Sequence, residues 1–179
     1  MITSGVSNPW GLYVDKNGTL YVANQTGSVT VYPAGSLYPS ATYTQNLDRP
    51  LYPIADQYGD LFVGNAGTSG TVVEYLAGST STYRVLQTPG TEVDGMDFDQ
   101  QGNLYVAYRN GFTGGSVEEF APGSTQGQIL GMTIRQPQGL IVDAEGNIVV
   151  SLSAEKAVVL FRPGAQYRAG GVRLPAGSG

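Results

Sequence analysis

Short stretches of alternating hydrophobic and polar residues run along the whole chain, each four to six residues long, as in "LYVA" and "VTVY". Such alternation places successive side chains on opposite faces of a strand. No stretch repeats apolar residues three and four positions apart over a dozen residues, as an amphipathic helix would. The pattern therefore predicts an all-β chain made of many short strands.

One ten-residue phrase occurs four times, and this repetition organises the strands. It begins with Asp, has Gly three residues later and ends in a short apolar strand. The four copies are "DKNGTLYVAN" (15–24), "DQYGDLFVGN" (56–65), "DQQGNLYVAY" (99–108) and "DAEGNIVVSL" (143–152). A fixed period of this length is the sequence mark of a repeat architecture.

Each repeat contains four strand-like segments. An apolar stretch precedes the Asp, and the short strand after the Gly leads through a variable loop to a third segment. The third segments are "VTVYPAGS" (29–36), "VVEYLAGS" (72–79), "VEEFAPGS" (117–124) and "VVLFRPGA" (158–165). The fourth, weaker segments are "ATYTQNL" (41–47), "TYRVLQ" (82–87), "GQILGM" (127–132) and "YRAGGVRLP" (167–175). Since Asp accepts hydrogen bonds from nearby amides and Gly adopts positive φ, each D-x-x-G phrase predicts a tight turn between the first two strands.

This repeat predicts a β-propeller. A sheet of four short strands cannot bury both faces alone, so neighbouring sheets must stack, and a repeat of about 40–45 residues is typical of propeller blades. We predict a single domain over 1–179, with blades at about 9–50, 51–92, 93–136 and 137–175. Three arrangements fit four blades: a closed four-bladed ring, part of a longer propeller, or half of a larger ring completed by a second chain.

The repeat resembles the NHL-type propeller repeat, especially its bacterial versions. The resemblance rests on the pattern P-x-G-L-x-V-D-x-x-G-N-L-Y-V-A-N followed by V-x-V-Y-x-P-G-S, and it extends over 9–165. It implies a propeller fold, usually of six blades, but no particular function, because such blades serve enzymes, binding domains and scaffolds. Blade 3 departs from the pattern with "EVDGMDFD" (92–99), and blade 4 with "VVSLSAEKA" (149–157).

Composition narrows the classes of partner. The chain has a net charge of −5 and a pI near 4.5, which argue against nucleic acid or an anionic membrane surface as its partner. No apolar run approaches the roughly 20 residues that span a bilayer. The start of the chain shows no signal peptide. A surface rich in Ser, Thr, Gly and Tyr but poor in Lys favours an extracellular or periplasmic location.

The chain has neither Cys nor His. Disulfides, thiolate or imidazole metal sites, and Ser-His or Cys-His catalysis are therefore excluded. The repeat also resembles the streptogramin-cleaving and peptide-amidating propeller lyases, but the His residues on which those enzymes rely are missing here. We therefore expect a protein that is not an enzyme.

The variable loops before the first strand and between the second and third strands of each blade are expected to form a binding rim. Candidate ligand contacts on this rim are Trp10, Gln25, Tyr52, Asn65, Asp94, Tyr108, Arg109 and Gln138. The aromatic members could stack on a sugar or peptide, or Trp10 could instead pack between blades. The longest loop is predicted in blade 3, "YRNGFTGGS" (108–116), which also contains Phe112.

An acidic group, Glu92, Asp94 and Asp97, is the other candidate for chemistry. Paired carboxylates bind a hard cation or act as acid and base. A resemblance to the gluconolactonase and regucalcin propellers implies a metal such as Ca²⁺ in the central channel, but Trp10, Leu51 and Gln138 stand where other blades would supply ligands. We expect no cofactor and a scaffold that binds a protein, peptide or glycan, or copies of itself. The alternative is a metal-dependent, lactonase-like hydrolase that uses Glu92 and Asp94.

Overall fold

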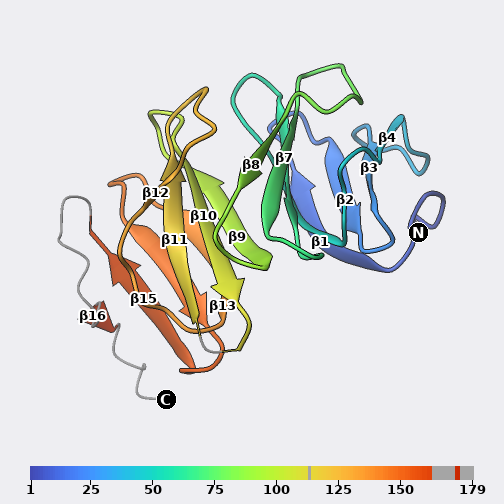
Figure 1. Cartoon of the computed structure of the whole chain (residues 1–179). Coiled ribbons are helices and arrows are strands. Elements are labelled where there is room, and N and C mark those ends of the chain that lie inside the picture. Colours follow the sequence, from blue (N-terminus) through green and yellow to red (C-terminus); the bar gives the residue numbers. More distant parts are fainter. Residues whose placement is uncertain (113, 163–171, 174–179) are drawn as a thin grey trace, which may run out of the picture. The chain divides into compact units, whose positions relative to one another are not determined.

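The computed structural model of the chain describes residues 1–112, 114–162 and 172–173. The regular secondary structure of these residues consists of β-strands, which form four antiparallel sheets of four strands each (Figure 1). None of these residues belongs to a helix long and apolar enough to cross a membrane. The predicted all-β architecture of four four-stranded blades is confirmed.

Each blade takes its four strands in sequence order. Blade 1 consists of β1 (Pro9–Val14), β2 (Leu20–Asn24), β3 (Ser28–Tyr32) and β4 (Ala41–Tyr43), and blade 2 of β5 (Pro50–Ala55), β6 (Leu61–Asn65), β7 (Thr71–Tyr75) and β8 (Arg84–Gln87). Blade 3 consists of β9 (Glu92–Phe98), β10 (Leu104–Asn110), β11 (Gly114–Phe120) and β12 (Gln128–Ile129), and blade 4 of β13 (Pro137–Val142), β14 (Ile148–Leu152), β15 (Ala157–Phe161) and β16 (Val172–Arg173). Most of the predicted segment 167–175 lies outside the described residues.

The D-x-x-G phrases form the predicted turns. In the first, Oδ1 of Asp15 accepts hydrogen bonds of 2.8 Å from the backbone amides of both Asn17 and Thr19, and Gly18 has a φ of 80°. The other three turns repeat both features. Partial burial opposes ionisation of Asp15, but these amides outweigh it and lower its pKa, since they stabilise the carboxylate.

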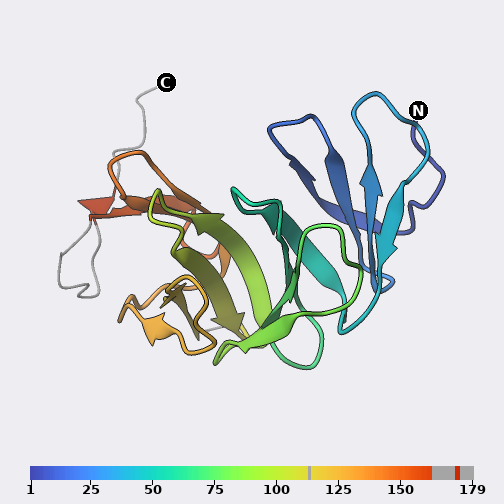
Figure 2. The ribbon, with the colours of Figure 1, turned by 90° about the horizontal axis from the view of Figure 1, so that it is seen from above.

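The chain divides into two compact units, Met1–Val93 and Asp94–Gly179. In the first, blades 1 and 2 (blue to green in Figure 2) share one core, where the rings of Tyr43 and Tyr75 meet edge to face with centroids 4.8 Å apart. In the second, blades 3 and 4 share another core, with Val117 on one sheet and Val150 on the other. Stacking of neighbouring sheets, as predicted for propeller blades, is therefore present in each unit.

A glycine four residues before the turn Asp lets the first strands of stacked blades approach. A Cβ atom at Gly11 of β1 would overlap the carbonyl oxygen of Leu51 in β5. A Cβ atom at Gly95 of β9 would lie 2.5 Å from the backbone nitrogen of Leu140 in β13. Both units thus use the same close backbone approach, which leaves no room for a side chain.

Polar bonds at two further repeat positions fix this approach. Two residues before the turn Asp, Tyr13 donates to the carbonyl oxygen of Ala55 at 3.2 Å, and Asp97 accepts from the amide of Val142 at 2.8 Å. One residue after the turn Asp, a long side chain donates to the next turn's backbone in each unit. These bonds join Lys16 to Gln57 at 3.5 Å and Gln100 to Ala144 at 3.2 Å.

In both blades of the first unit, a buried asparagine at the end of the second strand anchors the segment before the first strand. Asn65, at the end of β6, is buried, donates to the carbonyl oxygen of Asn46 at 2.9 Å and accepts from the amide of Asp48 at 3.2 Å. Asn24 holds the segment before β1 in the same way, through Gly5 and Ser7. At this position blades 3 and 4 have Tyr108 and Leu152.

Candidate functional site

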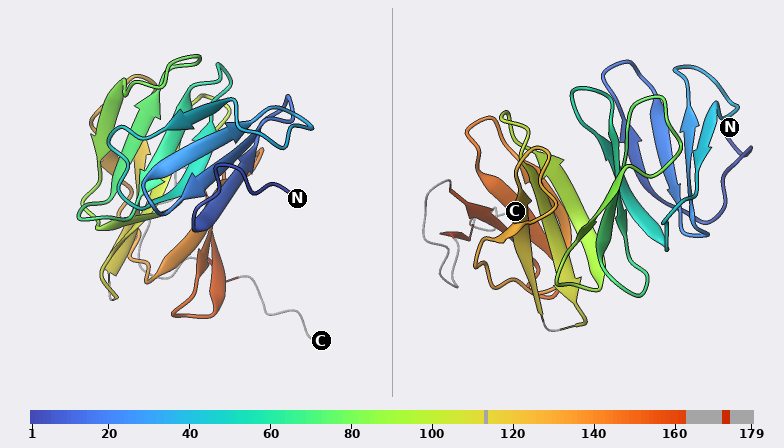
Figure 3. Two further views of the ribbon diagram at one scale, coloured as in Figure 1. Left: turned by 90° about the vertical axis from the view of Figure 1, so that its right-hand side faces the viewer. Right: turned by 45° about the horizontal axis from the view of Figure 1, so that its top comes forward.

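The β10–β11 hairpin of blade 3 has the longest of the second and third strands among the four blades. Its strands have seven residues each, against five in the corresponding pairs of the other blades. Pairing runs without a break from Leu104 opposite Phe120 to Asn110 opposite Gly114. The predicted long loop over 108–116 is therefore wrong for most of its length, since only residues 111–113 lie between the strands (Figure 3).

Glycines allow this hairpin to extend. Gly111 has a φ of 64°, which suits the turn. Gly115 lies against the segment that leads to β13: a Cβ atom there would be 3.3 Å from the carbonyl oxygen of Ile134 and 3.3 Å from Cδ of Pro137. The end of the hairpin is thus supported by its own unit.

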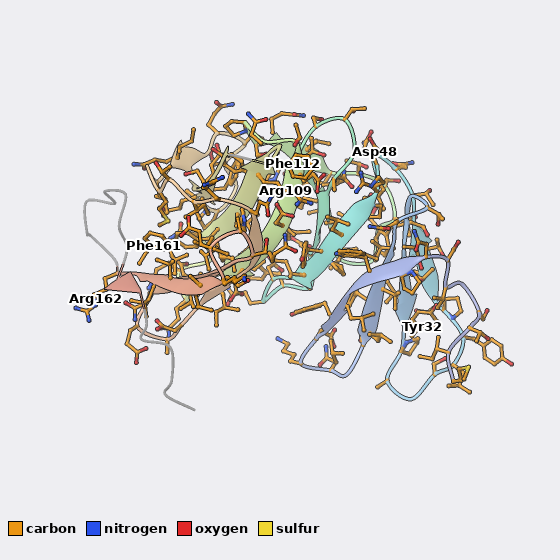
Figure 4. All side chains as sticks on the ribbon, turned by 90° about the horizontal axis from the view of Figure 1, so that it is seen from below. Tyr32, Asp48, Arg109, Phe112, Phe161 and Arg162 are labelled. Carbon is orange, nitrogen blue, oxygen red and sulfur yellow. The ribbon has the colours of Figure 1, made fainter. Side chains whose placement is uncertain are left out.

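Phe112 lies at the tip of the hairpin with 80% of its surface exposed. The side-chain amide of Gln136 donates to its backbone carbonyl oxygen at 3.4 Å. Figure 4 labels Phe112 and Arg109, which come from the same hairpin. The ring is thus presented to solvent from a short turn at the end of the paired strands.

Arg109 forms an ion pair close to the tip. Its Nε lies 3.4 Å from Oδ2 of Asp94 on β9, and the Asp94 side chain is almost fully buried while that of Arg109 is partly exposed. A buried carboxylate needs such a partner, because burial without one is costly. Asp94 therefore serves to hold Arg109 in place.

Of the other two acids in the group, Glu92 begins β9 and is half-buried, and Asp97 has a structural use comparable to that of Asp94. Asp97 accepts from its neighbour Phe98 at 2.9 Å and, as described above, from β13. In the part of the chain that the structure describes, no three acidic side chains come together in the way a metal ion requires. The geometry thus gives Asp94 and Asp97 structural partners.

The other predicted rim residues fall into two groups. Trp10 and Gln138 are exposed, and Tyr52 is partly exposed. Gln25 is half-buried, and its side-chain oxygen accepts from Asn8 at 2.9 Å. Asn65 and Tyr108 are buried, so their side chains are not available to a rim ligand. The sequence did not indicate that Asn65 and Tyr108 are buried, because polar residues near the end of a strand are usually exposed.

Glu118 of β11 is a buried acid that sequence reasoning missed. One of its oxygens, Oε2, has no hydrogen-bond partner, and a Cβ atom at Gly127 would overlap its carboxyl group. Burial raises the pKa of Glu118, because the charged form loses hydration. In the sequence "SVEEF", Glu118 and Glu119 lie side by side between Val117 and Phe120, so the pattern of apolar residues does not indicate which glutamate faces inward.

Glu118→Gln is expected to stabilise the fold at neutral pH by about 1 kcal/mol. A raised folded-state pKa gives stability that is complete below the unfolded value, near 4.5, and is lost as the pH rises through the folded value. The gain should therefore disappear near pH 4. Urea unfolding at pH 4 and pH 7 measures it, with the exposed Glu145→Gln as control. Equal shifts for both variants at neutral pH would show that Glu118 carries no burial penalty.

Comparisons with known proteins support the fold. No protein-family model matches the sequence, and no curated protein matches it. Among solved structures, a chain in a nidogen/laminin complex matches with a TM-score of 0.77 at 20% identity, covering 89% of this chain and 62% of that one. The WD40 β-propeller domain of Doa1 matches with a TM-score of 0.73 at 12% identity, covering 90% and 53%.

A streptogramin B lyase also matches, with a TM-score of 0.70 at 10% identity over 88% of this chain and 52% of the enzyme chain. This chain thus spans about half to three-fifths of the length of these structures. At such low identity the likeness concerns the fold alone. Together with the four sheets, which stack in pairs within each unit, it shows that the chain is built of β-propeller blades.

Proposed function

We propose that this chain is a non-catalytic binding scaffold of the NHL-repeat type, which presents the tip of its blade 3 hairpin to a segment of another protein in an extracellular or periplasmic setting. The observation that carries the proposal is the exposed ring of Phe112 in the turn at the end of an extended, paired hairpin. Binding residues are commonly carried at the ends of strands on a rigid scaffold.

The chemistry of the tip suits a peptide partner. Aromatic residues and arginine contribute most of the binding energy in protein interfaces. Phe112 supplies an exposed apolar ring, and Arg109 has donors on a planar group that suits a carboxylate or backbone carbonyl. Because Asp94 and the strand pairing already order Arg109, this side chain loses less entropy when a partner binds.

Other propellers support this proposal without deciding it. One matched chain comes from a nidogen/laminin complex, so blades of this kind occur in a protein–protein complex. The matched lyase shows that the same fold also serves catalysis. This chain has no His, and Asp94 is paired with Arg109, so nothing here favours the lactonase-like alternative over binding.

A peptide-display screen with the immobilised chain tests the proposal. Phe112→Ala is expected to weaken binding of the selected peptides by tenfold or more, a typical effect for a central aromatic contact. Tyr58→Ala removes an equally exposed ring from blade 2 and serves as control. Peptides that bind both variants equally would contradict the role of the hairpin, and selective binding on a glycan array would point to a carbohydrate ligand instead.

A further inference from the structure

Blade 1 carries a strip of exposed apolar side chains on its first strand. Trp10, Leu12 and Val14 occupy alternate positions of β1 and are 57%, 67% and 58% exposed. Leu12 and Val14 pair regularly with β2 and point to the same face, and Trp10 lies within the register shift between Pro9 and Leu12. All three side chains are apolar or largely apolar. Such a strip is unusual for a free protein surface and marks a site of contact.

The corresponding strip of blade 2 is covered. Leu51 and Pro53 occupy the repeat positions of Trp10 and Leu12, and both are buried. The cover is the glycine-bearing side of the preceding first strand, since Gly11 lies directly against Leu51 and Pro53. In the second unit, Gly95 of β9 lies against the backbone of Leu140 in β13, which is buried at the repeat position of Leu12 and Pro53, while Gln138 at the position of Trp10 is exposed. The chain therefore shows twice what covers such a strip.

Blade 4 carries a covering side of this kind that is open. Gly139 of β13 stands at the repeat position of Gly11 and Gly95, but among the described residues an added Cβ atom there would meet only Oγ of Ser151, at 3.5 Å. Next to it, Ile141 is 59% exposed. The face of β13 that carries Gly139 and Ile141 is thus exposed. The same face of β1 packs on blade 2, and that of β9 packs on blade 4.

Side chains on the open side of blade 4 match the strip on blade 1. Ile141 stands where Tyr13 and Asp97 make polar bonds in the other interfaces, and Ala144 stands where Lys16 and Gln100 do. Blade 4 therefore has apolar side chains at the two repeat positions that make polar bonds in blades 1 and 3. An apolar covering side fits the apolar strip of Trp10, Leu12 and Val14 and would bury both from water.

We propose that β13 of one copy packs on β1 of a second copy and so repeats between chains the blade-to-blade interface that each unit contains. Gly139 lies against the backbone of the second copy's Trp10, and Ile141 packs on its Leu12 and Val14. The contact joins two different surfaces, so it is heterologous and either closes into a ring of copies or extends into a chain. It does not involve the blade 3 hairpin and stands apart from the proposed binding role.

Sedimentation velocity of the whole chain over a wide dilution range tests this contact. Wild-type protein is expected to sediment as a species larger than the 18.8 kDa monomer at high concentration. Leu12→Asp and Ile141→Asp should each give monomers, because a buried carboxylate opposes the contact. Gly139→Ala should do the same, since its Cβ atom is at ordinary contact distance from Ser151 in the separate chain but would overlap the backbone of β1 in the contact. Ile129→Asp, at an exposed position on β12, should keep the wild-type mass.

Mixing the two aspartate variants tests the head-to-tail geometry. Each variant retains the surface that the other has lost, so an equimolar mixture should regain a two-chain species. Emission of Trp10, the only tryptophan, should shift to shorter wavelength as that species forms. Monomeric wild-type protein at every concentration would overturn the proposal, and so would variants that keep the wild-type mass or a mixture that stays monomeric. Phe112→Ala should leave the mass unchanged, which separates this contact from the rim.

Discussion

Gly11→Ala is expected to destabilise the first unit by about 3 kcal/mol, the upper part of the range for overpacking a core. The added Cβ atom would overlap the carbonyl oxygen of Leu51, and a backbone atom cannot move away as a flexible side chain can. Elsewhere such a change is neutral or stabilising, because alanine restricts the unfolded chain. Urea unfolding followed by circular dichroism measures the loss.

Gly139→Ala is the matched control for this prediction. It lies at the same repeat position, and its added Cβ atom would be at ordinary contact distance from Ser151. Both variants should be unfolded at high dilution, where contacts between copies do not contribute. If Gly11→Ala unfolds at the same urea concentration as Gly139→Ala, the close approach of β1 and β5 is absent in solution.

Asn65→Ala is expected to cost about 2–3 kcal/mol, because its buried side chain makes three hydrogen bonds, each worth about 1 kcal/mol. The amide of Asp48, the carbonyl oxygen of Asn46 and the hydroxyl of Thr71 all bond to this one side chain. Removing it loosens the linker between blades 1 and 2. Thermal or urea unfolding measures the loss.

The exposed Asn17→Ala is the control for Asn65, since its side chain lies in solvent at a turn. It should change stability by less than about 0.5 kcal/mol, as surface substitutions usually do. A similarly small effect for Asn65→Ala would mean that water replaces its bonds and that the linker is not held from β6. Such a result would also return Asn65 to the candidates for ligand contact.

Local chemistry explains why the blades could be predicted. The turn at Asp15 and Gly18 depends on residues within five positions of one another, and the same short phrase recurs in every blade. Strand alternation is equally local. The fold class, the number of sheets and their strand order therefore follow from the sequence.

The site was harder to predict because burial and pairing depend on distant residues. Asp94 looked like a free acid until β10 brought Arg109 beside it, 15 positions later in the chain. Asn65 looked like a rim residue, but its partners lie on a linker 17 and 19 positions earlier. The extended hairpin of blade 3 was mistaken for a loop, since its pairing out to Asn110 and Gly114 is not visible in the repeat pattern.

Blade stacking is tested most directly by proton nuclear Overhauser effects between the rings of Tyr43 and Tyr75. These rings belong to different blades, β4 of blade 1 and β7 of blade 2, and their centroids are 4.8 Å apart. With the two tyrosines assigned by Tyr→Phe substitution, strong cross-peaks between their ring protons are expected. Absence of these cross-peaks in a folded chain would show that blades 1 and 2 do not share a core, and would contradict the propeller-type packing from which the binding scaffold is inferred.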